Sequence, residues 1–225
     1  MDIAENIKSV QGRITDAALR SGRRPADVTL LAVTKTQPVE TIQKAYDAGL
    51  RAFGENRVQE ALEKMAQLPS DIHWHLIGRL QTNKINKMMG KFALVHSVDS
   101  LELALALSRR SGPQAQEVLL EVNTSGEATK AGIGPSRALE TAGKISGLAG
   151  LRLRGLMTVG PLTNDRIRQK NAFKELKGLF EAIRAKGYGQ GFDVLSMGMS
   201  GDLEAAIEEG STLVRVGTAL FGERH

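Results

Sequence analysis

Apolar runs alternate with segments of helical spacing along the whole chain. Several runs are apolar at every position, as in Leu-Leu-Ala-Val at 30–33, which is typical of parallel strands buried on both faces. Their short length and β-branched residues favour strands over helices. The predicted strands are Val28–Val33, Arg51–Gly54, Ile72–Ile77, Leu94–Val98, Val118–Asn123, Leu151–Met157, Val194–Met197 and Leu213–Val216.

Between these strands, apolar residues recur every three or four positions, which predicts covering helices. A charged, amphipathic helix is expected first, over Met1–Leu19. The linking helices are predicted at Val39–Ala48, Val58–Gln67, Thr82–Met89, Leu101–Arg110, Ser136–Ile145, Arg166–Lys186 and Leu203–Glu208.

The alternation of strands and helices predicts an α/β fold. Eight consecutive β/α units indicate a single (β/α)8 TIM barrel over residues 1–225, with an extra N-terminal helix. An open doubly wound sheet with extra strands is the alternative. No Gly-x-Gly-x-x-Gly follows the first strand, which counts against a dinucleotide-binding fold.

Composition and charge narrow the classes of function. At 225 residues with 41% apolar content, the chain is long enough for one sizeable core. No apolar run approaches the length of a membrane span and no signal sequence is evident, so a cytoplasmic protein without membrane contact is expected. Zero cysteines exclude disulfides, thiolate metal sites and cysteine nucleophiles. The formal charge of +5 is interspersed with acidic residues and aromatic residues are few, so nucleic-acid binding is not expected.

Polar residues cluster at the predicted carboxyl ends of the strands. In a TIM barrel these ends share one face, where active sites lie. The candidate site is therefore expected on this face. It would collect Lys35, Glu55, Asn56, Gly78, Arg79, Ser97, Asp99, Asn123, Thr158, Ser200, Gly217 and Thr218.

Lys35 follows the apolar run at 30–33 and precedes a polar turn. A lysine delivered by a buried strand to the end of that strand is a candidate Schiff-base former. Strand alternation places Lys35 on the side of Val33, and Arg215 on the side of Leu213, so both side chains are expected to point inward. The alternative for Lys35 is a solvated lysine at a strand end.

Two late segments have the features of a phosphate cradle. Ser200 precedes a predicted helix, so its hydroxyl and the backbone N–H groups of Gly201 and Asp202 are candidates for binding an anion. Gly217 and Thr218 follow the last strand, and loops after strands seven and eight are a frequent phosphate site of TIM barrels. A simple N-cap at Ser200 and a simple turn at Gly217 are the alternatives. A strand-end lysine with a phosphate cradle predicts pyridoxal phosphate, although a Schiff-base aldolase for a sugar phosphate combines the same parts.

Other polar residues are interpreted more plainly. His73 and His75 lie two apart on one strand, but no third ligand accompanies them, so no metal is expected. Glu127 and Lys130 are interpreted as a solvated loop pair. Glu55 is left between a carboxylate beside the cofactor ring and a salt-bridge partner.

Short motifs follow one another from one end of the chain to the other. They are Ala32–Thr36, Phe53–Asn56, Val58–Glu60, Trp74–Gly78, Leu80–Lys84, His96–Asp99, Arg154–Met157, Leu195–Ser200 and Val214–Thr218. Together they resemble the pyridoxal phosphate homeostasis protein family. Their number and order make the resemblance more specific than any single motif.

The resemblance implies a pyridoxal phosphate barrel of fold type III, similar to the N-terminal domain of alanine racemase. It implies pyridoxal 5'-phosphate held on Lys35 as a Schiff base, in a carrier or regulator of vitamin B6 and amino-acid balance without established turnover. Arg215 would face the pyridine nitrogen and, as a permanent cation, would weaken the ring as an electron sink. The implied phosphate residues are Ser200, Gly201, Gly217 and Thr218, and the implied ring-lining residues are Asn56, His75 and Met157.

Four positions depart from the family pattern. Thr34, Gln37, Arg57 and Gly201 stand where serine, a basic residue, tyrosine, and Asp or Ala are usual. None removes a predicted cofactor contact. Gln37 and Arg57 are expected to affect how cofactor or substrate approaches the open face.

A second, β-rich domain completes the site of alanine racemases, whereas this chain stops at His225, shortly after the last predicted strand. The cofactor is therefore expected to be open to water, and racemisation would lack a group on the opposite face of the ring. This favours a non-catalytic carrier; a minimal pyridoxal phosphate-dependent racemase is the alternative enzyme. The expected partners are the cofactor and apo-enzymes that require it, and a monomer is expected.

Overall fold

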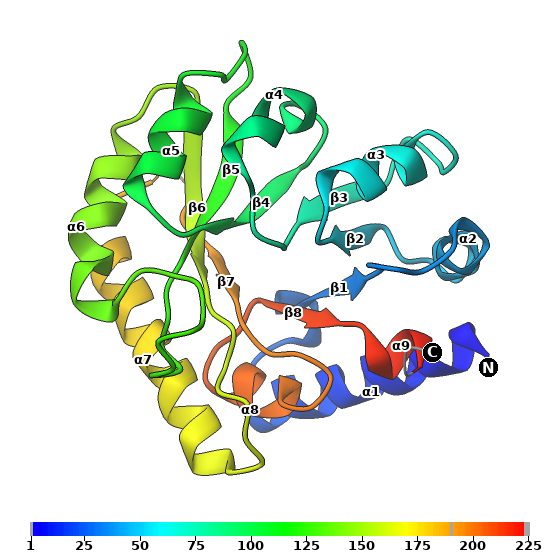
Figure 1. Ribbon diagram of the computed structural model, residues 1–225. Helices are drawn as coiled ribbons and strands as arrows, with labels where there is room; N and C mark the ends of the chain where they lie inside the picture. Colours follow the sequence, from blue (N-terminus) through cyan, green and yellow to red (C-terminus); the bar gives the residue numbers. More distant parts are fainter. Residues whose placement is uncertain (1, 190, 223–225) are drawn as a thin grey trace.

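Eight parallel strands pair in chain order, and the last strand pairs with the first to close a barrel. The computed structural model describes residues 2–189 and 191–222 (Figure 1). All eight predicted strands are confirmed, each within two residues at either end. They are β1 (Thr29–Val33), β2 (Ala52–Glu55), β3 (His73–Leu76), β4 (Leu94–Val98), β5 (Gln116–Glu121), β6 (Leu151–Met157), β7 (Val194–Ser196) and β8 (Leu213–Val216).

Helices surround the barrel and confirm the predicted β/α alternation. The helix predicted at Thr82–Met89 is divided into a 3-10 turn and a short α-helix. Two short elements, η1 and α9, were not predicted. The helical elements are α1 (Ile3–Arg20), η1 (Pro25–Asp27), α2 (Val39–Asp47), α3 (Val58–Met65), η2 (Thr82–Lys84), α4 (Ile85–Met88), α5 (Leu101–Ser108), α6 (Pro135–Ser146), α7 (Arg166–Ala185), α8 (Leu203–Glu208) and α9 (Thr218–Phe221).

The hydrophobic core has two separate parts because successive strand residues face opposite sides. The larger part, which includes Phe53 and Phe173, lies between the strands and the helices. A smaller cluster of Leu94, Leu119 and Met157 alternates with residues of the larger part, so it fills the inside of the barrel. Above this cluster the barrel interior is polar.

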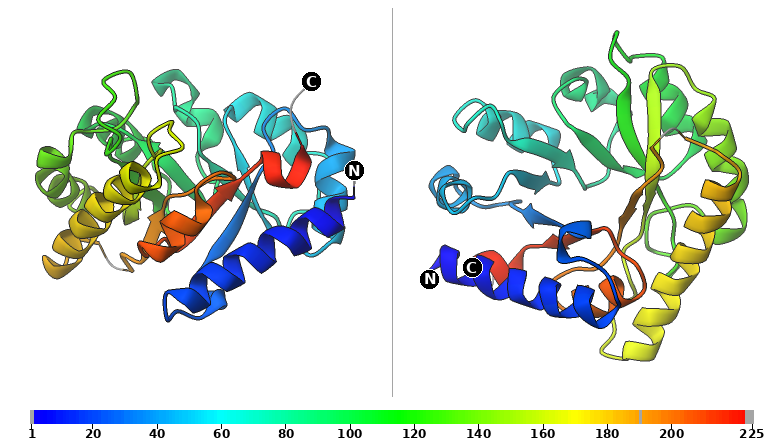
Figure 2. Two further views of the ribbon diagram at one scale, coloured as in Figure 1. Left: turned by 90° about the horizontal axis from the view of Figure 1, so that it is seen from below. Right: turned by 180° about the vertical axis from the view of Figure 1, so that it is seen from behind.

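Helix α1 precedes the barrel and packs against α8, α9 and α2. Its N-terminus is capped by Asp2, whose carboxylate accepts hydrogen bonds from the backbone N–H groups of Ala4 and Glu5. Its apolar face buries Ile7, Val10 and other residues against the barrel. The two further views in Figure 2 show α1 lying along β8, α8 and α9. The extra N-terminal helix is thereby confirmed, and it lies next to the last strand.

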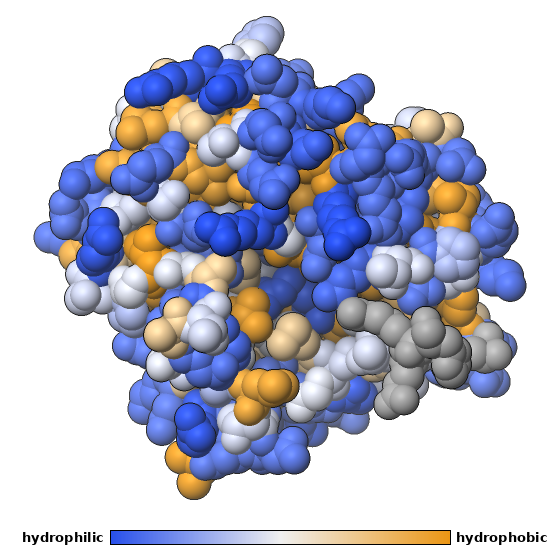
Figure 3. Space-filling model, in the orientation of Figure 1, coloured by the Kyte–Doolittle hydropathy of each residue, from blue (hydrophilic) through white to orange (hydrophobic). Residues whose placement is uncertain are grey.

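The molecular face in Figure 3 carries mainly hydrophilic residues, with hydrophobic ones in small separate groups. Among the described residues, no helix is both long and apolar enough to cross a membrane.

Candidate functional site

Lys35 lies in a tight turn just beyond the carboxyl end of β1 and is half-buried. Thr34 is held by the neighbouring strand, because its backbone N–H donates to the carbonyl oxygen of Gly54 at 2.9 Å. Thr36 has a φ of +65°, an uncommon conformation for a β-branched residue. The backbone N–H of Thr36 donates to a carboxylate oxygen of Glu60 at 2.6 Å, which stabilises this conformation. The turn that carries Lys35 is therefore fixed on both sides.

Glu55 supports the same turn from behind. Lys64, from α3, donates to Glu55 at 2.7 Å, to Glu60 at 2.6 Å and to the carbonyl oxygen of Thr34 at 2.8 Å. Burial raises the pKa of the Glu55 carboxyl, although hydrogen bonds from Lys64 and Thr34 oppose the shift. Glu55 therefore faces α3. Of the two roles considered for it from the sequence, the structure shows the salt-bridge partner.

A buried chain of hydrogen bonds crosses the upper barrel interior from β8 to β3. Arg215 donates to Ser196 Oγ at 2.6 Å and to the carbonyl oxygen of Thr158 at 2.8 Å. Ser196 Oγ lies 3.1 Å from His96 Nδ1, and His96 Nε2 lies 2.9 Å from His75 Nδ1. Arg215 is almost fully buried, so the prediction that it points inward is confirmed.

The contacts of Arg215 and Ser196 lead us to expect one tautomer for each buried histidine. Burial lowers the pKa of His75 to about 4 and the pKa of His96 well below its usual value, so both rings are neutral near pH 7. Ser196 Oγ accepts from Arg215 and keeps its own hydrogen, which we expect it to donate to His96 Nδ1. We then expect His96 to donate from Nε2 to His75 Nδ1, and His75 to carry its own proton on Nε2.

Arg215 keeps its charge in spite of burial. Burial lowers the pKa of the guanidinium to about 10, while Asp202 and Glu121 act in the opposite direction. It is therefore protonated at neutral pH and places a fixed positive charge in the barrel interior.

Glu121 ends β5 and is 7% exposed. Burial, together with the nearby carboxylate of Asp99, raises the pKa of Glu121 to about 7. Glu121 pairs in register with Met157, and Met157 pairs with Ser196, so it lies beside the polar interior. A carboxyl group with this pKa can hold or release a proton near neutral pH.

The two late loops present backbone donors to the open face. Among the described residues, no acceptor is found for the backbone N–H groups of Ser200, Gly201, Gly217 or Thr218. Ser200 Oγ accepts a hydrogen bond from the backbone N–H of Ala219 at 3.2 Å, which leaves its hydroxyl hydrogen available. These N–H and hydroxyl groups form a donor set that fits a phosphate dianion.

One detail of the predicted phosphate cradle is wrong. The N–H of Asp202 is occupied, because it donates to the carbonyl oxygen of Met199 at 3.2 Å. The alternative of a simple N-cap at Ser200 is also wrong, since α8 begins at Leu203 and Asp202 holds the cap position. The Ser200 hydroxyl instead links the two late loops through Ala219.

Helix α1 supports both of these loops. Arg13 donates to the carbonyl oxygen of Ser200 at 2.9 Å and forms two hydrogen bonds with Glu204, at 2.6 and 2.9 Å. Asn6 donates to the carbonyl oxygen of Leu220 at 2.9 Å, in α9. Because bidentate arginine contacts are directional, the Ser200 loop has a defined position.

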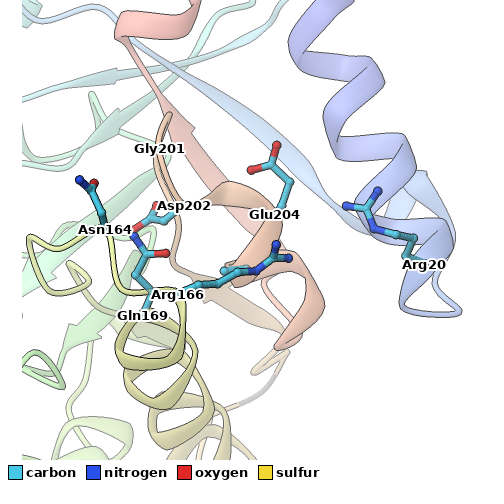
Figure 4. A pocket seen from close by; sticks show the side chains of 8 residues that line it. Arg20, Asn164, Arg166, Gln169, Gly201, Asp202 and Glu204 are labelled. Atoms are coloured by element: carbon cyan, nitrogen blue, oxygen red, sulfur yellow. The ribbon is translucent and has the colours of Figure 1, made fainter.

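Cavities border the Gly201–Asp202 turn. One of about 400 Å³ is shown in Figure 4, where Asn164 and Gln169 lie near Asp202 and Arg20 approaches from α1. A second cavity of about 550 Å³ shares Gly201 and Asp202 and also contacts Lys130. Solvent-filled space of small-molecule size therefore adjoins the donor loops.

The remaining predicted residues are distributed as follows. Asn56 is half-buried just after β2, while His75 and Met157 are buried inside the barrel. Glu127 and Lys130 form the predicted loop ion pair at 2.9 Å. His73 is exposed whereas His75 is buried, and no group of three or more His, Cys, Asp or Glu among the described residues could hold a metal.

Sequence reasoning missed four residues that shape the site: Arg13, His96, Glu121 and Ser196. Arg13 looked like one of many surface cations on an amphipathic helix. Glu121 and Ser196 each stand between apolar neighbours on a predicted strand, so strand alternation, as applied to Arg215, was a usable signal for both. His96 is followed by Ser97, so this signal was weaker there.

The family model "Alanine racemase, N-terminal domain" matches residues 3–225 of this chain. A pyridoxal phosphate homeostasis protein of Pseudomonas aeruginosa is 49% identical over 225 residues, with 99% of this chain and 96% of that protein covered. The protein of the same name from Aquifex aeolicus is 42% identical over 227 residues, with 100% and 99% covered.

The solved structures similar to the chain include PipY and an alanine racemase. PipY of Synechococcus elongatus PCC7942, solved with PLP bound, has a TM-score of 0.83 and 38% identity, covering 98% of this chain and 100% of that chain. Alanine racemase of Clostridium difficile has a TM-score of 0.77 and 15% identity, covering 99% of this chain and 57% of that chain. The racemase match concerns the fold alone.

Proposed function

The chain belongs to the pyridoxal phosphate homeostasis protein family, within the alanine racemase N-terminal domain class, and we propose that it binds pyridoxal 5'-phosphate as a carrier or regulator in vitamin B6 and amino-acid homeostasis. The proposal is carried by one observation. Strand β1 pairs in parallel with β8, so Lys35, just after β1, lies on the same face as the backbone donors that follow β8 and fit a phosphate. PipY, at 38% identity over 98% of this chain, was solved with PLP bound, which supports the proposal.

Each residue has a proposed part in holding the cofactor. The bound cofactor supplies an aldehyde that a lysine amine captures reversibly. Lys35 provides that amine on its fixed turn. Arg215 faces the pyridine nitrogen. Ser200, Gly201, Gly217 and Thr218 bind the phosphate, and Asn56, His75 and Met157 line the ring.

Arg215 gives the physical reason for a carrier. Because its guanidinium stays charged, it opposes protonation of a nearby ring nitrogen. A ring nitrogen without its proton is a poorer electron sink, so amino-acid chemistry at the cofactor is disfavoured. Binding and release need no electron sink, and these residues preserve both.

We further propose where and with what the protein acts. It works in the cytoplasm, as a monomer, with residues 1–225 forming a single domain. Apo-enzymes that require pyridoxal phosphate receive the cofactor from it. These points extend the expectations from the sequence.

The proposed function is tested by the absorbance of the purified chain after addition of pyridoxal phosphate, before and after borohydride. We expect a visible band that borohydride abolishes, and peptide mapping should find the trapped cofactor on Lys35. Lys35→Ala should lose this modification, while the exposed-site control Lys87→Ala should keep it.

Other outcomes identify the alternatives. A wild-type protein without the visible band would refute the cofactor assignment and favour a sugar-phosphate aldolase. Steady racemisation of an amino acid that Lys35→Ala abolishes would refute the carrier role and favour a minimal racemase.

A further inference from the structure

A separate cavity of about 410 Å³ opens between the start of α3 and the loop after β3. Three cationic side chains line it: Arg57, Arg79 and Lys84. They come from two segments, since Arg57 precedes α3 whereas Arg79 and Lys84 follow β3, so the fold brings the positive charges together at the cavity. Asn56 borders both this cavity and the proposed cofactor site, so the two share the open face of the barrel.

The charge of this cavity is only partly balanced locally, because one of its three cations, Arg79, has a carboxylate partner. The described residues that line it include no carboxylate. Asp99 lies outside the lining, with one oxygen 3.8 Å from Arg79 Nε. Glu60 is nearby in α3, but its carboxylate already accepts hydrogen bonds from Lys64 and from the Thr36 backbone. The net positive charge therefore favours an anionic ligand.

The cavity also offers neutral donors. The side-chain amides of Gln59 and Gln81 belong to its lining. Arg57 occupies the N-cap position of α3 and forms no side-chain cap, so the first-turn N–H groups of α3 keep their hydrogen-bonding capacity. These donors add directional contacts to the charge of the three cations.

The floor of the cavity is rigid. At Gly78 a Cβ atom would clash with the carbonyl oxygen of Asn56, so the two loops touch through their backbones. Ser97 donates to the carbonyl oxygen of Gly78 at 2.7 Å and ties the contact to β4. A preformed floor lowers the ordering cost of binding a small molecule.

We propose that this cavity is a second anion site, which binds the phosphate monoester of a small molecule. Three cations and planar arginine forks suit a phosphate dianion better than a single carboxylate. The volume falls within the range of small-molecule sites. This inference goes beyond the proposed function, because the cavity contains none of the residues assigned to the cofactor phosphate.

The test uses the full chain loaded with pyridoxal phosphate and reduced with borohydride, so that the first phosphate cradle is filled. Inorganic phosphate is titrated by calorimetry into the wild type and into Arg57→Gln/Arg79→Gln. We expect binding to the wild type and at least about tenfold weaker binding to the double variant. The matched control Arg109→Gln/Arg137→Gln removes two exposed arginines elsewhere and should bind phosphate as the wild type does.

Equal affinity of the two double variants, or no binding to the wild type, would overturn the proposal. Acetate binding as tightly as phosphate would also overturn it. Pyridoxine 5'-phosphate and glycerol 3-phosphate then separate the sources: a preference for the former assigns the cavity to a second B6 vitamer, and equal binding assigns it to phosphate esters in general.

Failure of the proposed function gives a different result. If borohydride traps no cofactor, the carrier proposal fails. The same titration on the unloaded chain, compared between the two double variants, still decides whether the cavity binds phosphate.

Discussion

The tautomer of His75 is expected to depend on a donor at the far end of the hydrogen-bond network. Arg215 can only donate, so Ser196 accepts from it, and we expect Ser196 to pass its own hydrogen to His96. The expected direction of donation then runs from β8 to β3. His75 Nε2 would then be a hydrogen-bond donor, although Arg215 does not contact that ring.

We expect His75 and His96 to be neutral and protonated on Nε2 at pH 7. Two-bond 1H–15N correlation spectra report the tautomer of each ring directly. Ser196→Ala removes the donor to His96 Nδ1, so His96 should lose its single tautomer. A wild-type His96 protonated on Nδ1 would contradict the proposed direction of donation.

A second residue-scale prediction concerns Lys64. Its ammonium neutralises Glu55, whose carboxylate is buried. Lys64→Met should lower the free energy of unfolding by about 3 kcal/mol, because it leaves a buried carboxyl group without its cation. Urea unfolding measures this loss. Adding Glu55→Gln to Lys64→Met should recover most of it; a double variant no more stable than the single one would show that the ion pair is not the cause.

Glu121 predicts a pH dependence of stability. Its folded-state pKa of about 7 exceeds the ordinary value of a glutamate, so the folded state binds the proton more tightly than the unfolded state. Its contribution is full below about pH 4 and is lost as the pH rises through 7. Glu121→Gln should therefore be more stable than the wild type at pH 8, by about 1–3 kcal/mol, and equal to it near pH 4.

Urea unfolding from pH 4 to pH 8 checks this prediction. The exposed-site control Glu102→Gln should follow the wild-type curve. If the curves of Glu121→Gln and the wild type run parallel throughout, another group titrates in this range.

At the scale of elements, α1 has a function beyond covering the barrel. It contacts the Ser200 loop through Arg13 and α9 through Asn6. Both contacts end on carbonyl oxygens of the segments that present the phosphate donors. The helix therefore positions a site that it does not itself line.

Arg13→Gln should weaken the binding of pyridoxal phosphate about five- to tenfold, because the Ser200 loop loses a charged hydrogen bond. The affinity for pyridoxal, which has no phosphate, should stay unchanged. Absorbance titrations with both vitamers measure the ratio, and Lys8→Gln on the exposed side of α1 is the control. An equal loss for both vitamers would indicate a general structural effect instead.

Elements with a regular pattern were predictable, and those without one were not. Short runs rich in apolar residues indicated all eight strands, and several were apolar at every position, as parallel strands buried on both faces often are. The four-residue helix α9 is too short to show helical periodicity. Ser200 was interpreted from its sequence neighbours, yet its hydroxyl accepts from Ala219, nineteen residues later. Such tertiary contacts, like the one between Arg13 and Ser200, leave no local signal.

The candidate site could be predicted in outline, because its residues lie at the ends of regular strands. Strand-end positions follow from the fold, so Lys35 and Gly217 could be assigned to one face before the structure was known. The orientation of Glu55 toward α3 depends on Lys64, and only the folded chain shows that contact. The cationic cavity likewise needed the folded loops, because Arg57 is separated in the chain from Arg79 and Lys84.

At the scale of the whole molecule, the cofactor should stabilise the fold by linkage. A ligand that binds only the folded state at a hundred times its Kd raises the free energy of unfolding by about 2.7 kcal/mol. Urea unfolding with and without pyridoxal phosphate should show this gain for the wild type. Lys35→Ala should show a smaller gain, and an equal gain would mean that Lys35 contributes nothing to affinity.

The pairing of β1 with β8 has a consequence for biosynthesis. Lys35 leaves the ribosome long before Gly217 and Thr218, the phosphate donors that follow the strand paired with β1. A nascent chain can therefore expose the reactive lysine before it can retain the cofactor. Retention of pyridoxal phosphate would then mark the chains whose barrel has closed.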